Sequence, residues 1–358
     1  MPANGSSQKI PQERSSGLEE QMHYLHEIEQ ELKRKAKKTF KEELVFILTH
    51  RISLSFFFSS VILLYLAVKI DYGELSGDLE RIRLLPLFFA VMAMVGVIHL
   101  RALRWYLLLR MKCPELEFRD FIFPFYLGDA LSVFIPMKLG EALAMGIPPK
   151  YLKVPLSVSL STTWFYRLFD MSLVTLTVII LFPILFRGTT GFELVITATI
   201  LVLLFFLYGL FNQDFGFKVA RTLKLKFLED NLEQIYTDLG QMRSSAMMGT
   251  FFLSFLVWLL FSLMIVFVMA GFGADTGILV MVAAVGIYVA VGVPLSSAGI
   301  GAGTLGSVYV LRHAGDLPES QALAVMLVYG FIIAVVQGAF GLLGNIMTHS
   351  VVEKRFRE

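Results

Sequence analysis

The sequence predicts an all-α fold: a polytopic helical membrane protein with about six spans and two re-entrant broken-helix segments, arranged as an inverted repeat. Its 358 residues are 56% hydrophobic and only 17% charged. Soluble domains have about 25% charged residues, and a long chain with so few charges cannot cover a water-facing surface. The positions of the charges, and the prolines and glycines that interrupt two apolar runs, decide the rest of the topology.

The composition also excludes several functional classes. The single cysteine, Cys113, excludes an intramolecular disulfide framework and a cysteine-based metal site. A net charge of +2 gives no reason to expect a nucleic-acid partner. The chain has no HExxH motif, no paired-cysteine spacing and no His/Asp/Ser constellation, so we expect no catalytic residue, no metal and no cofactor. It also has no ATPase motif, so active transport would need an ion gradient or a partner.

The first 45 residues are predicted to be cytosolic. Residues 1–18 are typical of a disordered tail and lack the apolar core of a signal peptide. Residues 19–43 combine helical spacing with dense charge. They include a basic cluster that predicts a positive-inside topology anchor, with recognition of anionic lipids as the alternative. Its members are Lys33, Arg34, Lys35, Lys37, Lys38 and Lys41.

Six apolar runs are long enough to cross a bilayer. Two further runs, 121–136 and 277–306, are interrupted by Pro and Gly and carry polar residues. The transmembrane domain is therefore expected over residues 46–348, with a cytosolic C-terminal tail at 349–358. The predicted spans are Leu54–Ile70, Leu84–Leu109, Val154–Phe186, Phe192–Phe211, Gly249–Gly271 and Ser320–Met347.

The distribution of Lys and Arg decides whether the two interrupted runs cross the bilayer. If both are re-entrant and the N-terminus is cytoplasmic, 22 of these residues fall inside and 5 outside. If both cross, the numbers become 16 and 11. The positive-inside rule therefore favours re-entrant segments. It also predicts a multi-pass protein of the cell membrane with both termini in the cytoplasm.

This topology predicts two units of similar layout. Repeat 1, at about 84–186, and repeat 2, at about 249–347, each consist of a span, a broken segment and a span. Pro136 and Pro294, which mark the two breaks, lie 158 positions apart. The first segment enters from the cytoplasm and the second from outside, so the repeats are inverted. Many transporters build alternating access from such repeats.

The first break carries three ionisable residues. Pro136 and Gly140 interrupt the helix, where an amide-lined turn can form. Asp129, Lys138 and Glu141 flank them. Ionisable groups within a membrane segment are costly, so by default they are candidates for substrate binding. Alternatively, Lys138 and Glu141 pair with each other and only close the turn.

Two further positions could contact a headgroup. Arg167 and Asp170 lie three apart in the middle of a span and share a helix face. Arg167 offers a planar fork of donors to a phosphate, with Asp170 orienting it. The alternative is an intrahelical pair tolerated for packing. Arg104, with Arg101, is either an interfacial anchor or a receiver of a lipid phosphate.

The second break is rich in glycine. Gly299 and Gly301 follow Pro294, and they permit unusual backbone angles and close approach to a ligand or to another helix. Close helix packing is the alternative. A glycine stripe in the last span, formed by Gly338, Gly341 and Gly344, predicts helix packing.

Four short motifs, in order within residues 50–348, carry a family resemblance: Leu100–Trp105, Pro136–Glu141, Arg167–Asp170 and Pro294–Gly301. In these the chain resembles the lysylphosphatidylglycerol synthase/flippase membrane-domain family of bacterial and archaeal integral membrane proteins. The resemblance implies a lipid flippase-type domain, related to the part of the larger synthases that moves an aminoacylated lipid between leaflets. Other relatives are implicated in polyisoprenyl-phosphate or cell-surface glycan pathways.

The chain departs from this family's pattern at several positions. Ala144 and Tyr166 stand where the family often has Arg and Glu. Ser297 and Thr304 replace a second Pro and a terminal Glu. These losses of charge point to a different headgroup or to a divergent member. Few residues follow Met347, so the soluble aminoacyl-transferase domain of the larger synthases is not expected here.

Together these observations predict a translocase, rather than a transferase, that moves a lipid or lipid-phosphate between leaflets. The expected partner is a membrane lipid with an anionic or phosphate headgroup. A membrane-embedded transferase with Asp170 or Glu141 as base is one alternative. An accessory subunit that recruits a cytosolic synthase is another, and a homo-oligomer is compatible with either.

Overall fold

Apolar helices make up most of the computed structural model. It describes residues 79–135, 139–186, 192–222, 231–241, 244–297 and 300–355, together with the isolated residues Gly73, Gly77 and Glu229. The predicted cytosolic helix at 19–43, the predicted span Leu54–Ile70 and the site candidates Pro136, Lys138 and Gly299 lie outside these residues.

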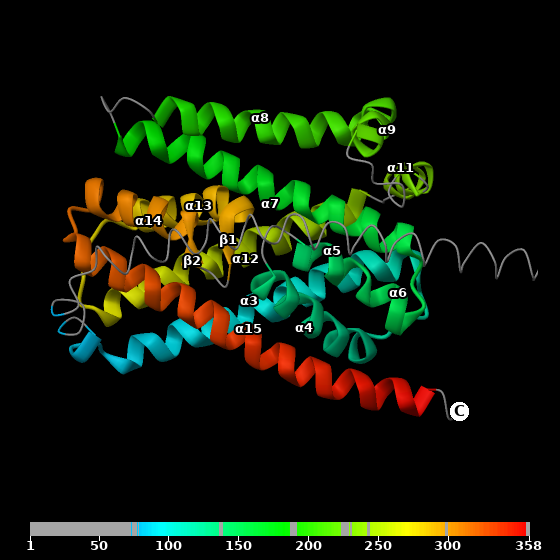
Figure 1. Cartoon of the computed structure of the whole chain (residues 1–358), viewed down its shortest axis with the longest axis horizontal. Helices are drawn as coiled ribbons and strands as arrows, with labels where there is room; N and C mark the ends of the chain where they lie inside the picture. The colour runs from blue at the N-terminus through cyan, green and yellow to red at the C-terminus, as the bar shows by residue number, and fades with distance from the viewer. Residues whose placement is uncertain are drawn as a thin grey trace, which may run out of the picture.

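Four of the described helices are long and apolar enough to cross a membrane. They are α3 (Leu84–Lys112), α7 (Leu156–Leu185), α12 (Ser244–Gly271) and α15 (Glu319–Arg355), and they run along the long axis of the molecule (Figure 1). Because no water in a bilayer can satisfy backbone groups, apolar runs of this length form helices. All four agree with predicted spans. A further predicted span forms α8 (Phe192–Phe211).

The two interrupted runs form helical hairpins. In the first, α4 (Phe118–Phe134) is followed by the short helices α5 (Leu139–Met145) and α6 (Ile147–Leu152). In the second, α13 (Ile278–Leu295) packs against α14 (Ala302–His313). Figure 1 shows that the hairpins enter from opposite ends of the helix bundle. Neither run continues as one helix, as the prolines and glycines predict.

The described residues are almost entirely helical, as the all-α prediction expects, and the tip of the second hairpin is a short exception. Two short strands, β1 (Ser296–Ser297) and β2 (Ile300–Gly301), pair antiparallel there, with Ser296 opposite Gly301. Gly301 has φ 155° and ψ −147°, a backbone region that is essentially restricted to glycine. Gly301 therefore permits a short strand pairing where the sequence predicts only a broken helix.

Glycines also set the closest approaches between helices. A Cβ placed on Gly140 would lie 1.9 Å from the carbonyl oxygen of Leu131, so α5 can pack this closely on α4 only with glycine there. The stripe on α15 packs against α4. A Cβ on Gly341 would lie 2.2 Å from the Cβ of Ala130, and one on Gly344 would lie 2.6 Å from the carbonyl oxygen of Phe123. The predicted packing role of the stripe is confirmed.

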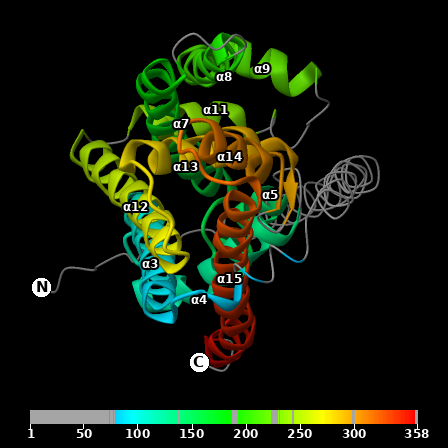
Figure 2. The same cartoon turned by 90° about the vertical axis from the view of Figure 1, so that its left-hand side faces the viewer.

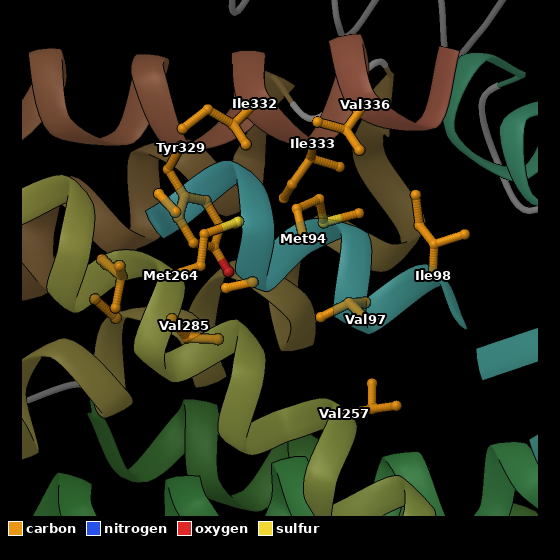
Figure 3. Close-up of a cluster of buried hydrophobic side chains, with 14 of the residues drawn as sticks. Met94, Val97, Ile98, Val257, Met264, Val285, Tyr329, Ile332, Ile333 and Val336 are labelled. Atoms are coloured by element: carbon orange, nitrogen blue, oxygen red, sulfur yellow. The ribbon is translucent and has the colours of Figure 1, made fainter. Parts of the chain in front are cut away.

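Contacts between the long helices and the hairpins hold the bundle together. The main contact joins α3 and α12, which lie side by side in Figure 2. The first hairpin packs through α4 on α15, and the second packs through α13 on α7. Figure 3 shows the buried side chains from α3, α12, α13 and α15 that fill the interior. They include Met94, Val97, Ile98, Val257, Met264, Val285, Tyr329, Ile332, Ile333 and Val336.

Two amphipathic helices, α9 (Gln213–Thr222) and α11 (Leu232–Gly240), lie at the end of the bundle where α3 finishes (Figure 1). The ammonium of Lys112 lies 3.2 Å from Oδ1 of Asp238 and donates a 2.6 Å hydrogen bond to Gln241. The pKa of the neighbouring Cys113 thiol is raised by burial first and by the Asp238 charge second. These contacts fasten α11 to the end of α3.

We expect Gly344→Ala to destabilise the protein, because its new methyl group would meet the backbone of α4. Overpacking of this kind costs about 1–3 kcal/mol. Thermal unfolding in detergent measures the loss. Gly249→Ala on α12 is the matched control, because nothing lies within 4 Å of its added Cβ. Equal stability of the two variants would contradict this packing of α15 on α4.

Cys113 is the single cysteine of the chain, so maleimide labelling reports on this position alone. Its raised pKa lowers the thiolate fraction at pH 7, and we expect slow labelling that accelerates as the pH rises. Asp238→Asn removes a charge that disfavours the thiolate and should accelerate labelling at pH 7. Asp214→Asn, on the exposed part of α9, should leave the rate unchanged. An unchanged rate in Asp238→Asn would refute the electrostatic contribution.

Candidate functional site

Ionisable side chains cluster where the first hairpin meets α3 and α7. The described residues contribute three guanidiniums and three carboxylates, so the formal charges of this cluster cancel. We call these six residues the charge network. Its members are Arg101 and Arg104 on α3, Asp129 on α4, Glu141 on α5, and Arg167 and Asp170 on α7.

The most deeply buried ion pair joins Arg104 and Asp170. Nη1 of Arg104 lies 2.6 Å from Oδ1 of Asp170, and Nη2 lies 3.1 Å from Oδ2, which is the two-pronged geometry of a guanidinium on a carboxylate. Nη1 also donates a 2.6 Å hydrogen bond to Ser254 on α12. Arg104 is only 2% exposed, and its guanidinium stacks 4.4 Å from the ring centroid of Tyr166. This pair therefore ties α3 to both α7 and α12.

Arg167 forms a second, more accessible pair. Its Nη2 lies 2.5 Å from Oε1 of Glu141, and its Nη1 lies 3.4 Å from Oδ2 of Asp170. The side chains of Arg167 and Glu141 are 19% and 15% exposed, whereas Asp170 is 8% exposed. The guanidinium of Arg167 lies 5.4 Å from the centroid of the Tyr166 ring. The same ring therefore contacts both Arg167 and Arg104. Arg167 thus connects α7 to the short arm of the hairpin.

Asp129 is the centre of a third group. Its Oδ1 lies 2.9 Å from Nη2 of Arg101, and its Oδ2 accepts a 2.6 Å hydrogen bond from Gln337 on α15. Asp129 and Gln337 are both buried. A buried carboxylate needs such partners, because leaving it without them is costly. These contacts fix the first arm of the hairpin between α3 and α15.

The charge network lies deep in the apolar part of the bundle. Asp170 is 14 residues from the start of α7 and 15 from its end. At 1.5 Å per residue, this helix is about 45 Å long and exceeds the roughly 30 Å hydrocarbon core of a bilayer. Asp170 therefore lies close to the middle of the span. Charges at this depth persist only when they are paired, as they are here.

The structure brings together most of the predicted site. Arg104, Glu141, Arg167 and Asp170 form one connected set, and Asp129 lies in the adjoining group. Asp170 makes its shortest bonds with Arg104 rather than with Arg167, which the sequence predicts as its partner. Arg104 is buried in an ion pair rather than placed as an interfacial anchor. Pro294 and Gly301 belong to the other hairpin.

Two residues that contact the charge network, Ser254 and Gln337, are not among the predicted site residues. Ser254 is one small hydroxyl residue in an apolar run, and such residues usually bond to their own helix. Gln337 does have a signal, because it is an amide within the apolar part of the last span. Only the packing of α12 and α15 shows that they contact Arg104 and Asp129.

The carboxylates of the network are partners of arginines rather than a cluster of metal ligands. Among the described residues, no group of three or more His, Cys, Asp or Glu side chains could hold a metal ion. What the arrangement can do is bind an anion. A guanidinium that is partly exposed and paired with a carboxylate can exchange that carboxylate for a phosphate oxygen, because both acceptors fit its fork.

Comparison with known families identifies the chain. The family model described as "Lysylphosphatidylglycerol synthase TM region" matches residues 52–341. The chain belongs to this family. Searches of curated proteins and of solved structures found no match. The motif resemblance is therefore confirmed, and membership relates this membrane protein to lipid modification or transport.

The motifs on which the resemblance to the lysylphosphatidylglycerol synthase transmembrane-region family rests include Arg101, Arg104, Glu141, Arg167 and Asp170. The structure places all five in the charge network, although the motifs are well separated along the chain. Family motif and folded site therefore coincide at the first hairpin.

The departures from the family pattern also have a place in the structure. Ala144 packs in the α4–α5 contact, where a Cβ added to Gly128 would lie 3.1 Å from its methyl group. Tyr166 lies against Arg104 and Arg167. Its ring contacts both guanidiniums without adding the negative charge of a Glu.

Asp170→Asn should destabilise the protein strongly, because it leaves Arg104 buried without its counter-charge. Removing one partner of a buried pair costs about 3–5 kcal/mol. Thermal unfolding in detergent measures this cost. Glu319→Gln removes one partner of an exposed pair with Arg312 and should change stability by less than about 1 kcal/mol.

A double variant shows whether Asp170→Asn destabilises the protein because a buried charge is left unpaired or because a contact between helices is lost. Arg104→Met combined with Asp170→Leu should recover most of the stability that Asp170→Asn loses, because no unpaired charge remains. If the double variant is as unstable as Asp170→Asn, or if Asp170→Asn matches Glu319→Gln, the pair is not the structural centre described here.

Proposed function

We propose that this protein moves a lipid or lipid-phosphate with an anionic headgroup between the two leaflets of the cell membrane. The observation that carries the proposal is the partly exposed Arg167–Glu141 pair, placed beside a broken helix within the membrane bundle. A lipid anion must cross the apolar core, where an unpaired charge is costly. A guanidinium at mid-depth that already holds one anion can take over another.

Arg167 is the group that would contact the headgroup. Its planar fork suits two phosphate oxygens, and Glu141 occupies that position in the structure. Arg104 suits this role less, because it is almost fully buried and bonded at both Nη atoms. The acyl chains would remain in the bilayer while the headgroup exchanges with Glu141.

The pairing of helices supports an inverted repeat of 84–186 and 249–347. Under exchange of the repeats, α3 corresponds to α12, the α4–α5 hairpin to the α13–α14 hairpin, and α7 to α15. The contact of α4 with α15 then corresponds to that of α13 with α7. Likewise the contact of α3 with α15 corresponds to that of α12 with α7. Such a pseudo-twofold relation suits rocking of one repeat against the other.

The opposite entry of the two hairpins supports the topology that the charge distribution predicts (Figure 1). In that topology the end of the bundle with α9 and α11 faces the cytoplasm, as do both termini. A headgroup would then reach the charge network from the cytoplasmic side through the first hairpin. A cytosolic synthase that supplies the lipid and a homo-oligomeric assembly remain predictions of the sequence.

Reconstitution tests the proposal. Vesicles with purified protein and a fluorescent phosphatidylglycerol or polyprenyl phosphate are treated with dithionite, which quenches the outer leaflet. We expect headgroup movement well above that of protein-free vesicles for at least one anionic lipid. Movement no faster than in protein-free vesicles, across several anionic lipids, would refute translocation.

Arg167→Ala should reduce that movement by about 10- to 100-fold, because a charged hydrogen bond contributes about 1.5–3 kcal/mol. Arg167→Lys should retain an intermediate rate, because the charge remains but the fork is lost. Arg119→Ala is the control, since Arg119 is exposed and pairs with Glu117 outside the network. Transport by Arg167→Ala at the rate of the control would exclude Arg167 as the headgroup contact.

A further inference from the structure

The face of α7 that meets the first hairpin carries a row of polar side chains. Ser159, Thr163 and Arg167 follow one another at intervals of four, so they lie one above another on the same face of the helix. Asp170 extends the row by a further turn. In the topology that the charge distribution predicts, the start of α7 faces the cytoplasm. The row then leads from that side to the charge network.

Two members of this row bond to opposite ends of α5. Oγ of Ser159 donates a 2.6 Å hydrogen bond to the carbonyl oxygen of Met145, the last residue of α5. Arg167 donates to Glu141, which stands in the first turn of α5. Thr163 is one helical turn from each of these contacts. It therefore faces the same strip of surface, which we call the α5–α7 seam.

Thr163 is buried without a hydrogen bond. The residue is only 2% exposed, and its Oγ1 has no hydrogen-bond partner among the described residues. A threonine hydroxyl in a helix usually bonds to a carbonyl of the preceding turn, as Thr162 does to Val158. A buried hydroxyl without a partner is costly and is uncommon in folded proteins. This hydroxyl is thus a donor that a ligand can use.

Arg167 has an unused donor of its own, one turn further along α7. Its Nη2 bonds to Glu141 and its Nη1 lies 3.4 Å from Asp170. Its Nε is buried and has no partner within the described ranges. Side chains four apart on a helix are neighbours, with about 5–6 Å between their Cβ atoms. One phosphate can therefore accept a hydrogen bond from each of these two donors.

We propose that Thr163 is a further ligand of the headgroup, and that its hydroxyl and Nε of Arg167 donate to two oxygens of the lipid phosphate in the α5–α7 seam. This inference rests on the proposed translocation of an anionic lipid. Residues 141–146 are all partly exposed, so the α5 side of the seam is open to the surroundings. Because Thr163 is buried, α5 moves away from α7 when the phosphate binds.

Binding to the full-length protein in detergent tests the role of Thr163. Isothermal titration with dihexanoyl phosphatidylglycerol measures the affinity for the headgroup. Thr163→Val removes the hydroxyl and keeps the shape of the side chain. We expect it to weaken binding at least about 10-fold, as loss of a hydrogen bond to a charged group does. Its thermal unfolding midpoint should equal or exceed that of the wild type, because the new methyl group needs no partner.

Two further variants separate ligand binding from a structural role. Thr163→Ser keeps the hydroxyl and should keep most of the affinity. Thr177→Val is the matched control on the same helix, because the Thr177 hydroxyl donates a 2.9 Å hydrogen bond to Leu173 and the residue packs on the second hairpin. This control should bind the lipid as tightly as the wild type.

Inorganic phosphate tests the source of the ligand. It should compete with dihexanoyl phosphatidylglycerol for the wild type, because both offer the same acceptor oxygens. If inorganic phosphate binds and the lipid does not, the seam is a site for free phosphate and the proposed lipid ligand is wrong.

The remaining outcomes distinguish this inference from the proposed function. Lipid binding by Thr163→Val at wild-type affinity would overturn the role of Thr163 and leave translocation standing. A loss of affinity that comes with a matching loss of stability would make the hydroxyl structural, and it would overturn the role as well. A wild-type protein that moves no lipid in vesicles would refute the proposed translocation, and this inference with it.

Discussion

The ion pair between Arg104 and Asp170 is the constraint on which the rest of the site depends. Within a bilayer a guanidinium or a carboxylate can persist only with a partner, and these two are almost fully buried near the middle of α7. Their contact, with the hydrogen bond to Ser254, joins α3, α7 and α12. Asp170 makes its two shortest hydrogen bonds with Arg104. The shortest hydrogen bond of Arg167 is therefore made with Glu141, on the first hairpin.

The polar pairs of the site differ in burial, and we infer that they differ in role as well. Arg104–Asp170 and Asp129–Gln337 fasten helices together, and they lie where solvent does not reach. Arg167–Glu141 lies at the accessible side of the same cluster and joins a long helix to a short one. The buried apolar side chains of α3, α12 and α15, among them Met94, Met264 and Tyr329, form the interior of the bundle (Figure 3).

Much of this architecture can be predicted from the sequence, because the bilayer restricts what an apolar run can do. Composition and spacing predict the spans from Leu84 and Gly249, the breaks near Pro136 and Pro294, and the glycine stripe of α15. They do not predict which ionisable side chains pair with one another. Spacing pairs Arg167 with Asp170, but only the packing of α3 against α7 brings Arg104 closer. The strand pairing after Leu295 likewise depends on the backbone angles of Gly301, which glycine permits but does not dictate.

In the proposed function, the headgroup phosphate takes the place of Glu141 on Arg167. Solid-state NMR of the protein in phosphatidylglycerol bilayers tests it most directly, by dipolar dephasing of ¹³C-labelled arginine guanidinium carbons by lipid ³¹P. We expect dephasing of one guanidinium resonance that disappears in Arg167→Lys and grows stronger in Glu141→Gln. Dephasing that survives Arg167→Lys unchanged, or none in any variant, would contradict it.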